Sequence, residues 1–296
     1  MNPNPLDLKA YLNEKRALVD KALEACLNET DGPASQVIDS MKYSLFAGGK
    51  RLRPILCLAG AEAVGGGEAD TLPVACALEL IHTYSLIHDD LPVMDDDDLR
   101  RGKPTNHKVF GEAVAMLAGD GLLTEAFNLI AVAGNSEKVS SDALLKVIGI
   151  IARASGYRGM IGGQLVDIQW EGKTAEPSLV EFIHSRKTGA LITASVVSGA
   201  ILAGADEPQI KSMTSYGEKT GLAFQIADDI LDIEGDSNAM GKTAGADKKM
   251  GKVTYPAVVG LDRSREIQEK LIEAAIESLA TFGSLAEPLR LIARYI

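Results

Sequence analysis

The sequence predicts an all-α protein that forms one domain of about ten or more helices. Apolar residues recur at helical spacing along nearly the whole 296-residue chain. No segment shows a convincing alternation of period two, so no strands are needed. Ala, Leu and Ile are abundant and aromatic residues make up only 5%, which favours helices. No stretch resembles a linker between domains, so we expect residues 1–296 to fold as one unit.

The expected helices follow one another along the chain. The first begins at Leu8 and ends near Asn28, and the second starts after Pro33 and closes at Gly48-Gly49. The remaining expected helices cover 54–64, 72–90, 110–133, 141–154, 178–203, 208–233 and 265–280. The stretches 134–141, 170–178 and 234–256 are expected to be loops. The last is long and rich in glycine and lysine, which in a compact domain indicates a functional or disordered segment.

Composition narrows the class of protein and of partner. A hydrophobic content of 46% with 24% charged residues is typical of a soluble globular chain. The net charge of −11 argues against nucleic acid as a partner. It leaves an anionic ligand open, because clustered Lys and Arg or bound metal ions reverse the sign of a site locally.

Cysteine usage and hydropathy bear on location. Cys26, Cys57 and Cys76 lie in apolar helical contexts, at spacings that suit neither zinc nor a disulfide framework. Reduced thiols and a cytoplasmic location are therefore expected. The N-terminus lacks the pattern of a signal peptide. No run approaches the ~20 apolar residues that cross a bilayer, so no membrane insertion is expected.

One cluster of carboxylates lies in the sequence LAFQIADDILDIEGD. Helical spacing places Asp228 and Asp229 on a face with Asp232, and Gln225 lies on or beside the same stripe. A solvated helix face is the ordinary explanation of such a cluster. Here the flanks are apolar and no Lys or Arg relieves the repulsion, so the carboxylates are expected to hold a hard cation such as Mg²⁺.

A second group of carboxylates lies in HDDLPVMDDDDLRRGKPT. Asp89 and Asp90 are followed by Asp95, and Pro92 should disturb the helix between them. We expect a bulge to absorb the excess spacing and return Asp95 to the face of Asp89. An EF-hand calcium loop would require alternating ligands and a glycine at its sixth position, and both are missing.

Basic residues are available to complete a phosphate site, because Mg²⁺ held by few carboxylates usually bridges to substrate phosphates. Most single lysines are surface residues, but several basic groups lie beside glycine turns or acidic runs. They are Lys50, Arg53, Arg100, Arg101, Lys187 with Thr188 where the helix could break, and Lys242 and Lys252 in the long loop. His82 lies seven residues before Asp89 and so shares its helix face. Together they predict two anion subsites, one reached through metal ions and one purely basic.

Several of these stretches resemble one enzyme family. The sequences DDLPVMDDDDLRRGKPT and FQIADDILD are similar to the first and second aspartate-rich motifs of the trans-isoprenyl diphosphate synthases. GGKRLRP, ELIHTYSLIHDD, GMIGGQLVD and RKTGALI match other blocks of that family in the same order, from about residue 35 to about residue 260. The resemblance implies an isoprenoid synthase fold, with helices around a central apolar cavity and residues 1–296 as one polyprenyl synthetase domain.

The resemblance also implies a reaction and roles for the residues. The family condenses an allylic diphosphate with isopentenyl diphosphate, assisted by about two or three Mg²⁺ ions, with Mn²⁺ as an alternative. Metal binding would fall to Asp89, Asp90, Asp95, Asp228, Asp229 and Asp232, and isopentenyl diphosphate binding to Lys50, Arg53, His82 and Arg101. Allylic diphosphate would contact Arg100, Lys187, Thr188, Gln225, Lys242 and Lys252. Asp89, Asp95, Asp228, Lys187, Thr188 and Gln225 would be catalytic, and a homodimer is expected.

Product length is expected to depend on Tyr84 and Ser85, about one helical turn before Asp89. In the family, an aromatic residue here together with a two-residue insertion, within Leu91 to Met94 in this chain, goes with a C15 farnesyl product. Geranylgeranyl (C20) and geranyl (C10) products are alternatives, and Tyr84 could instead be ordinary helix packing.

Two more distant alternatives stay open. A class I terpene cyclase shares the first aspartate motif and the helical fold. Its second motif mixes Asn or Asp, Ser or Thr, and Glu, whereas this chain reads Asp-Asp-Ile-Leu-Asp. A non-catalytic partner subunit or a divalent-ion-binding protein would be favoured by degraded aspartate or lysine positions, and none is degraded here.

Overall fold

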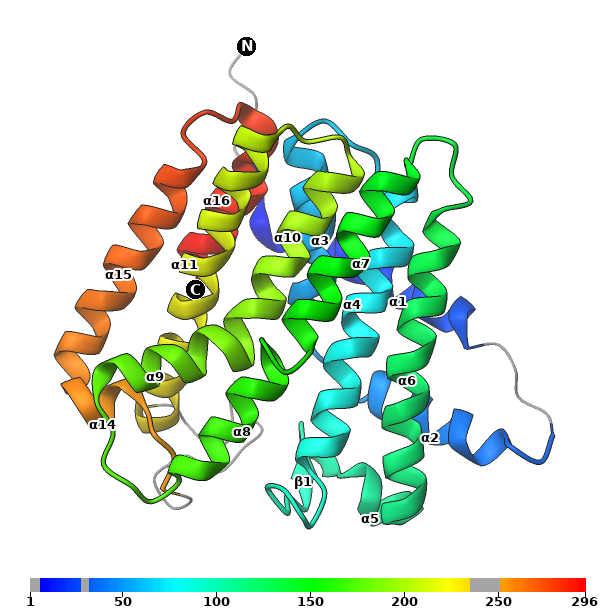
Figure 1. The fold of residues 1–296 in the computed structure, drawn as a ribbon, viewed down its shortest axis with the longest axis vertical. Coiled ribbons are helices and arrows are strands. Elements are labelled where there is room, and N and C mark those ends of the chain that lie inside the picture. The colour runs from blue at the N-terminus through cyan, green and yellow to red at the C-terminus, as the bar shows by residue number, and fades with distance from the viewer. Residues whose placement is uncertain (1–5, 28–31, 235–250) are drawn as a thin grey trace.

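Helices make up nearly all of the chain that the computed structural model describes, which is residues 6–27, 32–234 and 251–296 (Figure 1). The principal helices are α1 (Leu8–Cys26), α2 (Ser35–Leu45), α3 (Leu52–Ala63), α4 (Glu68–Asp89), α6 (Glu112–Ala133), α7 (Ser141–Ser155), α8 (Met160–Trp170), α9 (Pro177–His184), α10 (Ala190–Leu202), α11 (Glu207–Glu234), α15 (Leu261–Ser278) and α16 (Glu287–Tyr295). Shorter helices are α5 (Asn106–Phe110), α14 (Tyr255–Val259) and the 3-10 turn η2 (Ser284–Ala286). The all-α prediction is confirmed.

The structure differs from the expected elements at a few places. Two short antiparallel strands, β1 (Leu99–Arg100) and β2 (Lys103–Pro104), follow the first acidic run, where no strand was predicted. The single helix expected over 178–203 is α9 and α10 joined by one π-helical turn, η1 (Ser185–Gly189). Helix α8 was missed because Gly162 and Gly163 lower its local helix propensity, which tertiary packing overrides.

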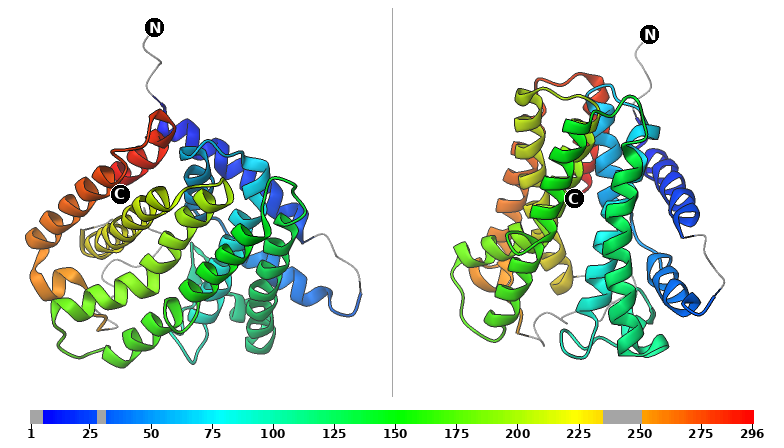
Figure 2. Two further views of the ribbon diagram at one scale, coloured as in Figure 1. Left: turned by 45° about the horizontal axis from the view of Figure 1, so that its top comes forward. Right: turned by 45° about the vertical axis from the view of Figure 1, so that its right-hand side comes forward.

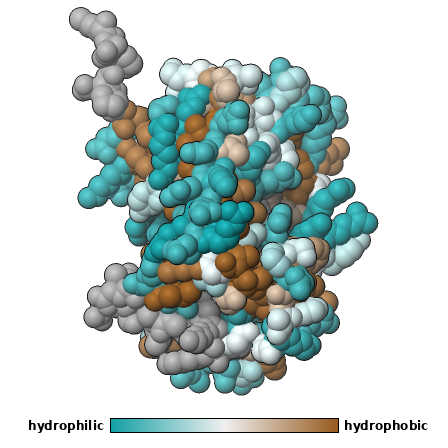
Figure 3. Space-filling view, turned by 90° about the vertical axis from the view of Figure 1, so that its left-hand side faces the viewer, coloured by the Kyte–Doolittle hydropathy of each residue, from teal (hydrophilic) through white to brown (hydrophobic). Residues whose placement is uncertain are grey.

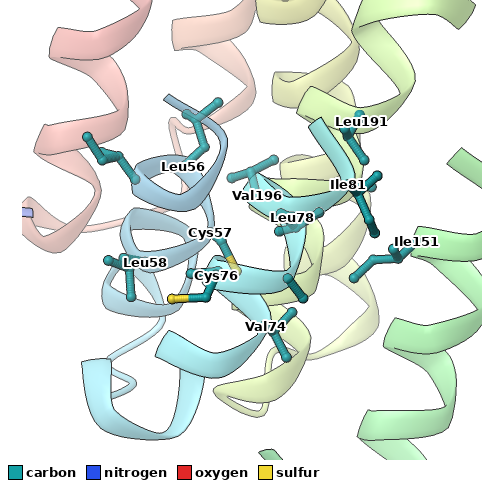
Figure 4. Packing of buried hydrophobic residues seen from close by; sticks show 14 of the residues in the cluster. Leu56, Cys57, Leu58, Val74, Cys76, Leu78, Ile81, Ile151, Leu191 and Val196 are labelled. Carbon is teal, nitrogen blue, oxygen red and sulfur yellow. The ribbon is translucent and has the colours of Figure 1, made fainter. Parts of the chain in front are cut away.

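The core is centred on α3, α4 and α10, whose facing side chains are small and aliphatic (Figure 4). Cys57 and Cys76 lie inside it as free buried thiols, beside Leu78 and Val196. A second, smaller hydrophobic cluster packs Ile226 and its neighbours on α11 against α9 and α14. Since α11 contributes to both clusters, it ties the two parts of the bundle together. The single domain over residues 1–296 and the central apolar cavity stay predictions.

The helix ends that carry the acidic motifs point to the same end of the bundle. Figure 1 shows α4 and α11 both running from the upper end of the view to the lower end, where β1 and α14 also lie. The two turned views in Figure 2 keep this arrangement. The fold therefore gathers the two predicted acidic motifs at one end of the molecule.

The outer surface differs from side to side. Figure 3 shows the side that carries α15 as mostly hydrophilic. Helix α6 instead leaves apolar side chains uncovered, with Leu117 58% exposed and Val132 44% exposed. In the described part of the chain, α6 alone is long and apolar enough to cross a membrane by length and composition. The sequence expectation concerned uninterrupted apolar runs, and Glu112, Asp120 and Glu125 interrupt α6, so the expected absence of membrane insertion stays a prediction.

Candidate active site

The first acidic motif forms where α4 stops. Pro92 cannot donate a backbone hydrogen bond, and the chain leaves the helix after Asp89. The backbone amide of Met94 donates to the Leu91 carbonyl at 2.8 Å, and that of Asp95 donates to the Asp89 carbonyl at 2.9 Å. A turn, rather than the expected helical bulge, therefore brings Asp95 back to Asp89.

Asp89 lies in a crowded electrostatic setting. The pKa of its carboxyl is raised to about 6, mainly by burial and also by the neighbouring Asp95, against the opposing effect of Lys187, Arg100 and Lys252. The Lys252 Nζ atom lies 3.4 Å from Asp95 Oδ2. Two carboxylates and three basic side chains from distant parts of the chain thus meet here. A desolvated pair of carboxylates gains from a bound cation, so this donor set suits Mg²⁺ bridged to phosphate oxygens.

Asp90 faces a different partner. Its carboxylate is buried, and Arg100 donates from Nε to Asp90 Oδ1 at 2.8 Å. The β1–β2 hairpin carries Arg100, so the hairpin anchors the guanidinium to the end of α4. Asp90 therefore acts as the counter-charge of Arg100, and its predicted metal-binding role stays a prediction without a contact to support it.

The second acidic motif occupies the last turns of α11. Asp228 is exposed, Asp232 is half-buried and Asp229 is buried. Among the described residues, no three His, Cys, Asp or Glu side chains converge as in a closed metal site. An open pair of carboxylates is nevertheless the usual protein contribution to Mg²⁺ that also binds substrate phosphates.

Lys187 and Thr188 sit on the π-helical turn η1, an irregularity that is frequent at functional sites. Glycines allow neighbouring helices to approach it: a Cβ on Gly221 of α11 would lie 2.7 Å from the Gly189 Cα atom, and one on Gly163 of α8 would overlap the backbone of Lys187. Lys187 Nζ donates to the buried Asp167 Oδ2 at 2.6 Å. This hydrogen bond fixes the position of the Lys187 ammonium group, whose other N–H groups can bind an anion.

Thr188 and Gln225 form a pair across the site. The Thr188 Oγ1 atom donates to Gln225 Oε1 at 2.8 Å, which joins η1 to α11. The Gln225 Nε2 atom donates in turn to Asp229 Oδ1 at 3.2 Å. The predicted pair is therefore in contact and is held by a buried carboxylate.

A second cationic cluster surrounds His82. Burial lowers the pKa of His82 well below its ordinary value, and Arg53, Arg101 and other arginines lower it further, so the ring is neutral at pH 7. Burial likewise lowers the pKa of Arg53 to about 10, and Arg53 Nε is shielded from solvent without a hydrogen-bond partner in the described chain. A desolvated guanidinium with an unused donor is suited to bind an anion.

Backbone strain marks the edge of this cluster. Arg51 and Arg101 both adopt left-handed backbone conformations, with φ of 52° and 54°. Such conformations are costly for residues other than glycine and gather at functional sites. Arg51 donates to Glu79 Oε1 at 2.8 Å and to Asp20 Oδ1 at 2.7 Å. These two carboxylates therefore form their hydrogen bonds with Arg51.

The remaining predicted residues make the following local contacts. Lys50 lies over the ring of Tyr295, with its Nζ atom 6.0 Å from the ring centroid. Tyr84 is 6% exposed and packs edge-on against His88, while the Ser85 hydroxyl donates to the His82 carbonyl at 2.8 Å. Lys242 lies outside the described residues.

Sequence reasoning missed four residues that the structure brings into the site. Asp167 is the last residue of GMIGGQLVD and His184 lies two residues before RKTGALI, and neither residue was given a role. Glu79 is the first residue of ELIHTYSLIHDD but was given no role, and Tyr255 lies in the stretch 234–256 that was expected to be a loop. The spacing of 20 residues between Asp167 and Lys187 could not predict a contact, because it depends on how α8 packs against η1.

Comparison with known proteins identifies the family. Residues 35–286 match the polyprenyl synthetase family. This chain belongs to it. A geranylgeranyl pyrophosphate synthase from Catharanthus roseus is 51% identical over 98% of the chain and 81% of its own length. A farnesyl diphosphate synthase from Geobacillus stearothermophilus is 50% identical over 91% of the chain and 90% of its own length.

A solved structure agrees. Geranylgeranyl pyrophosphate synthetase from Pyrococcus horikoshii matches with a TM-score of 0.88 and 32% identity over 97% of both chains. The isoprenoid synthase fold is confirmed, and the polyprenyl synthetase family member described here is a prenyltransferase of isoprenoid biosynthesis. It is a short-chain trans-prenyl diphosphate synthase, of a family that generally uses Mg²⁺.

Proposed function

We propose that this synthase condenses isopentenyl diphosphate with dimethylallyl diphosphate and then with geranyl diphosphate, to give (2E,6E)-farnesyl diphosphate. Two anion sites of different chemistry support a two-diphosphate reaction: carboxylates with Lys187 at one, and Arg53 with Arg101 at the other. Buried Tyr84, one turn before Asp89, carries the proposal of a C15 product.

The chain's own residues can drive ionisation of the allylic diphosphate. Mg²⁺, when bound, neutralises charge on the departing diphosphate. Lys187, Arg100 and Lys252, which all act on Asp89, add fixed positive charge where negative charge develops. The oxygens of Thr188 and Gln225 would lie against the allylic cation and offset its charge. The predicted central apolar cavity would exclude the water that otherwise quenches the cation to an alcohol.

The second substrate would bind at the arginine cluster without metal. The buried Arg53 Nε atom gains a partner when a diphosphate oxygen enters, which removes the cost of an unpaired donor. Neutral His82 can donate one hydrogen bond without adding repulsion between cations. No protein base is evident beside the reacting carbons, so the released pyrophosphate would accept the proton.

The assay that tests this function is incubation with dimethylallyl diphosphate, isopentenyl diphosphate and Mg²⁺, followed by chromatography of the dephosphorylated alcohols. Farnesol as the main product supports the proposal, whereas geranylgeraniol or geraniol would replace it with a C20 or C10 product. Hydrocarbons formed from an allylic diphosphate alone would indicate a terpene cyclase. No turnover by pure protein would favour a non-catalytic subunit.

Tyr84→Ala is expected to lengthen the product from C15 to C20 and beyond, because it removes a buried ring one helical turn before Asp89. Product chromatography measures the change. Tyr84→Phe keeps the ring and the edge-on contact with His88, so it is the matched control and should still give C15. C15 as the sole product of Tyr84→Ala would rule out Tyr84 as the limit.

We also propose a homodimer formed through α6. Leu117 is 58% exposed on this helix, whose apolar face continues over Met116 and Phe127. Leu117→Asp is expected to shift the mass measured by light scattering from dimer to monomer. Leu285→Asp alters a leucine of similar exposure, 56%, on η2 and should leave the mass unchanged. A monomeric parent protein would contradict the proposal.

We also propose a cytoplasmic location, which we infer from the three reduced thiols.

A further inference from the structure

Asp229 is the one aspartate of the second acidic motif that the described chain buries fully, with a side chain 2% exposed. Three donors from three separate elements converge on it. His184 Nε2 of α9 donates to Oδ2 at 2.7 Å, and the backbone amide of Tyr255 of α14 donates to the same oxygen at 2.9 Å. Gln225 Nε2, from α11 itself, donates to Oδ1 at 3.2 Å.

These contacts leave little of the carboxylate for a metal ion. An ionised carboxyl group accepts about four hydrogen bonds, and Oδ2 already accepts two. Mg²⁺ dehydrates reluctantly and usually keeps several waters, so it favours carboxylates that water can reach. Asp228 is exposed and Asp232 is half-buried at the same end of α11, and both meet that condition better.

We propose that Asp229 is a positioning residue and not a Mg²⁺ ligand. His184 is the last residue of α9 before η1, so its bond to Asp229 fixes the start of the turn that carries Lys187 and Thr188. Gln225, which donates to Asp229, also accepts a 2.8 Å hydrogen bond from Thr188 Oγ1, so Asp229 fixes the position of Thr188 as well.

One buried carboxylate thereby sets the position of three elements. The bond to the Tyr255 amide holds the start of α14, and the rings of His184 and Tyr255 lie 5.5 Å apart. The catalytic consequence rests on the proposed function. Loss of the carboxylate misplaces Lys187 and Thr188 and lowers kcat, while metal affinity is kept.

The test compares Asp229→Asn with Asp228→Asn in the full chain. Mn²⁺ binding in the presence of inorganic pyrophosphate is measured by electron paramagnetic resonance. Asp229→Asn should keep Mn²⁺ affinity within about twofold of the parent while kcat falls about 10- to 100-fold. Asp228→Asn should lose about tenfold or more in Mn²⁺ affinity. Equal losses of Mn²⁺ affinity in the two variants would overturn the proposal.

A second arm needs neither metal nor turnover, so it also decides the matter if the proposed function is wrong. In EDTA, Asp229→Ala should lower the midpoint of thermal unfolding by more than Asp228→Ala does, because Asp229 is buried and Asp228 is exposed. Adding His184→Ala to Asp229→Ala should cost less than the sum of the two single changes, because they remove the same bond. Additive decreases of the unfolding midpoint would contradict a stabilising hydrogen bond between His184 and Asp229.

Conservative substitutions separate positioning from simple loss of structure. The amide oxygen of Asp229→Asn can still accept from both His184 and the Tyr255 amide, so its kcat should exceed that of Asp229→Ala. Should Asp229→Ala not fold, His184→Gln provides the same test: kcat should fall and Mn²⁺ affinity should not. A fall in Mn²⁺ affinity with His184→Gln would overturn the proposal.

Discussion

Asp89→Asn is expected to lower kcat by about 10²- to 10³-fold at saturating Mg²⁺, the usual effect of losing one group that stabilises developing charge. Asparagine keeps the shape of the side chain and removes the charge that binds the cation. Burial raises the pKa of Asp89 to about 6, so the ionised form is already costly in the metal-free protein and gains most from a bound cation. Steady-state kinetics over a range of Mg²⁺ concentrations measures the loss.

Asp98→Asn is the matched control for that change. Asp98 belongs to the same acidic run, but its side chain is 76% exposed and pairs with Lys108 on the surface. Its turnover should stay within about twofold of the parent, since surface ion pairs contribute little. Near-normal turnover by Asp89→Asn would remove the first acidic motif from the reaction.

The fold could be predicted well because its information is local. Helical periodicity placed α1, α7, α11 and α15 within a few residues of their observed bounds. Some of the elements that were missed depend on contacts between distant segments. The π-helical turn η1 exists where Gly163 and Gly221 let α8 and α11 approach closely, and no pattern within 178–203 records that approach.

The candidate site could be predicted in its residue types better than in its partners. The chemistry of aspartates beside lysines indicated metal and diphosphate, and Asp89, Asp95, Lys187 and Lys252 do meet. A sequence cannot show which of two adjacent aspartates faces solvent. Asp90 and its neighbour Asp89 look alike in sequence, yet the end of α4 directs Asp90 to Arg100.

Buried counter-charges were the hardest feature to foresee. Glu79 lies in an apolar stretch of α4 and pairs with Arg51, 28 residues away. Nothing in the local pattern distinguishes it from a solvated glutamate on a helix. Its effect is nevertheless large, because it acts on Arg53 and Arg101 as well as on Arg51.

Arg51→Met is therefore expected to lower the free energy of unfolding by about 3–5 kcal/mol, the usual cost of breaking a buried ion pair on one side. Arg51 is 3% exposed, and its loss removes the hydrogen-bonded counter-charge of buried Glu79 and the guanidinium donor to the Leu45 carbonyl. Urea denaturation measures the change. Arg16→Met is the matched control: Arg16 pairs with Asp20 too, at 3.5 Å, but is 48% exposed, so its loss should cost less than about 1 kcal/mol.

The same variant should weaken binding at the arginine cluster. Without Arg51, the negative charge of Glu79 is offset only by Arg53 and Arg101, which it also contacts electrostatically. The positive potential that attracts a diphosphate to these two arginines then decreases. The KM for isopentenyl diphosphate should rise while that for the allylic substrate changes little. Adding Glu79→Gln should restore part of both stability and KM, because it removes the buried charge left unpaired. A cost no larger than that of Arg16→Met would show that Arg51 does not neutralise Glu79 in the folded protein.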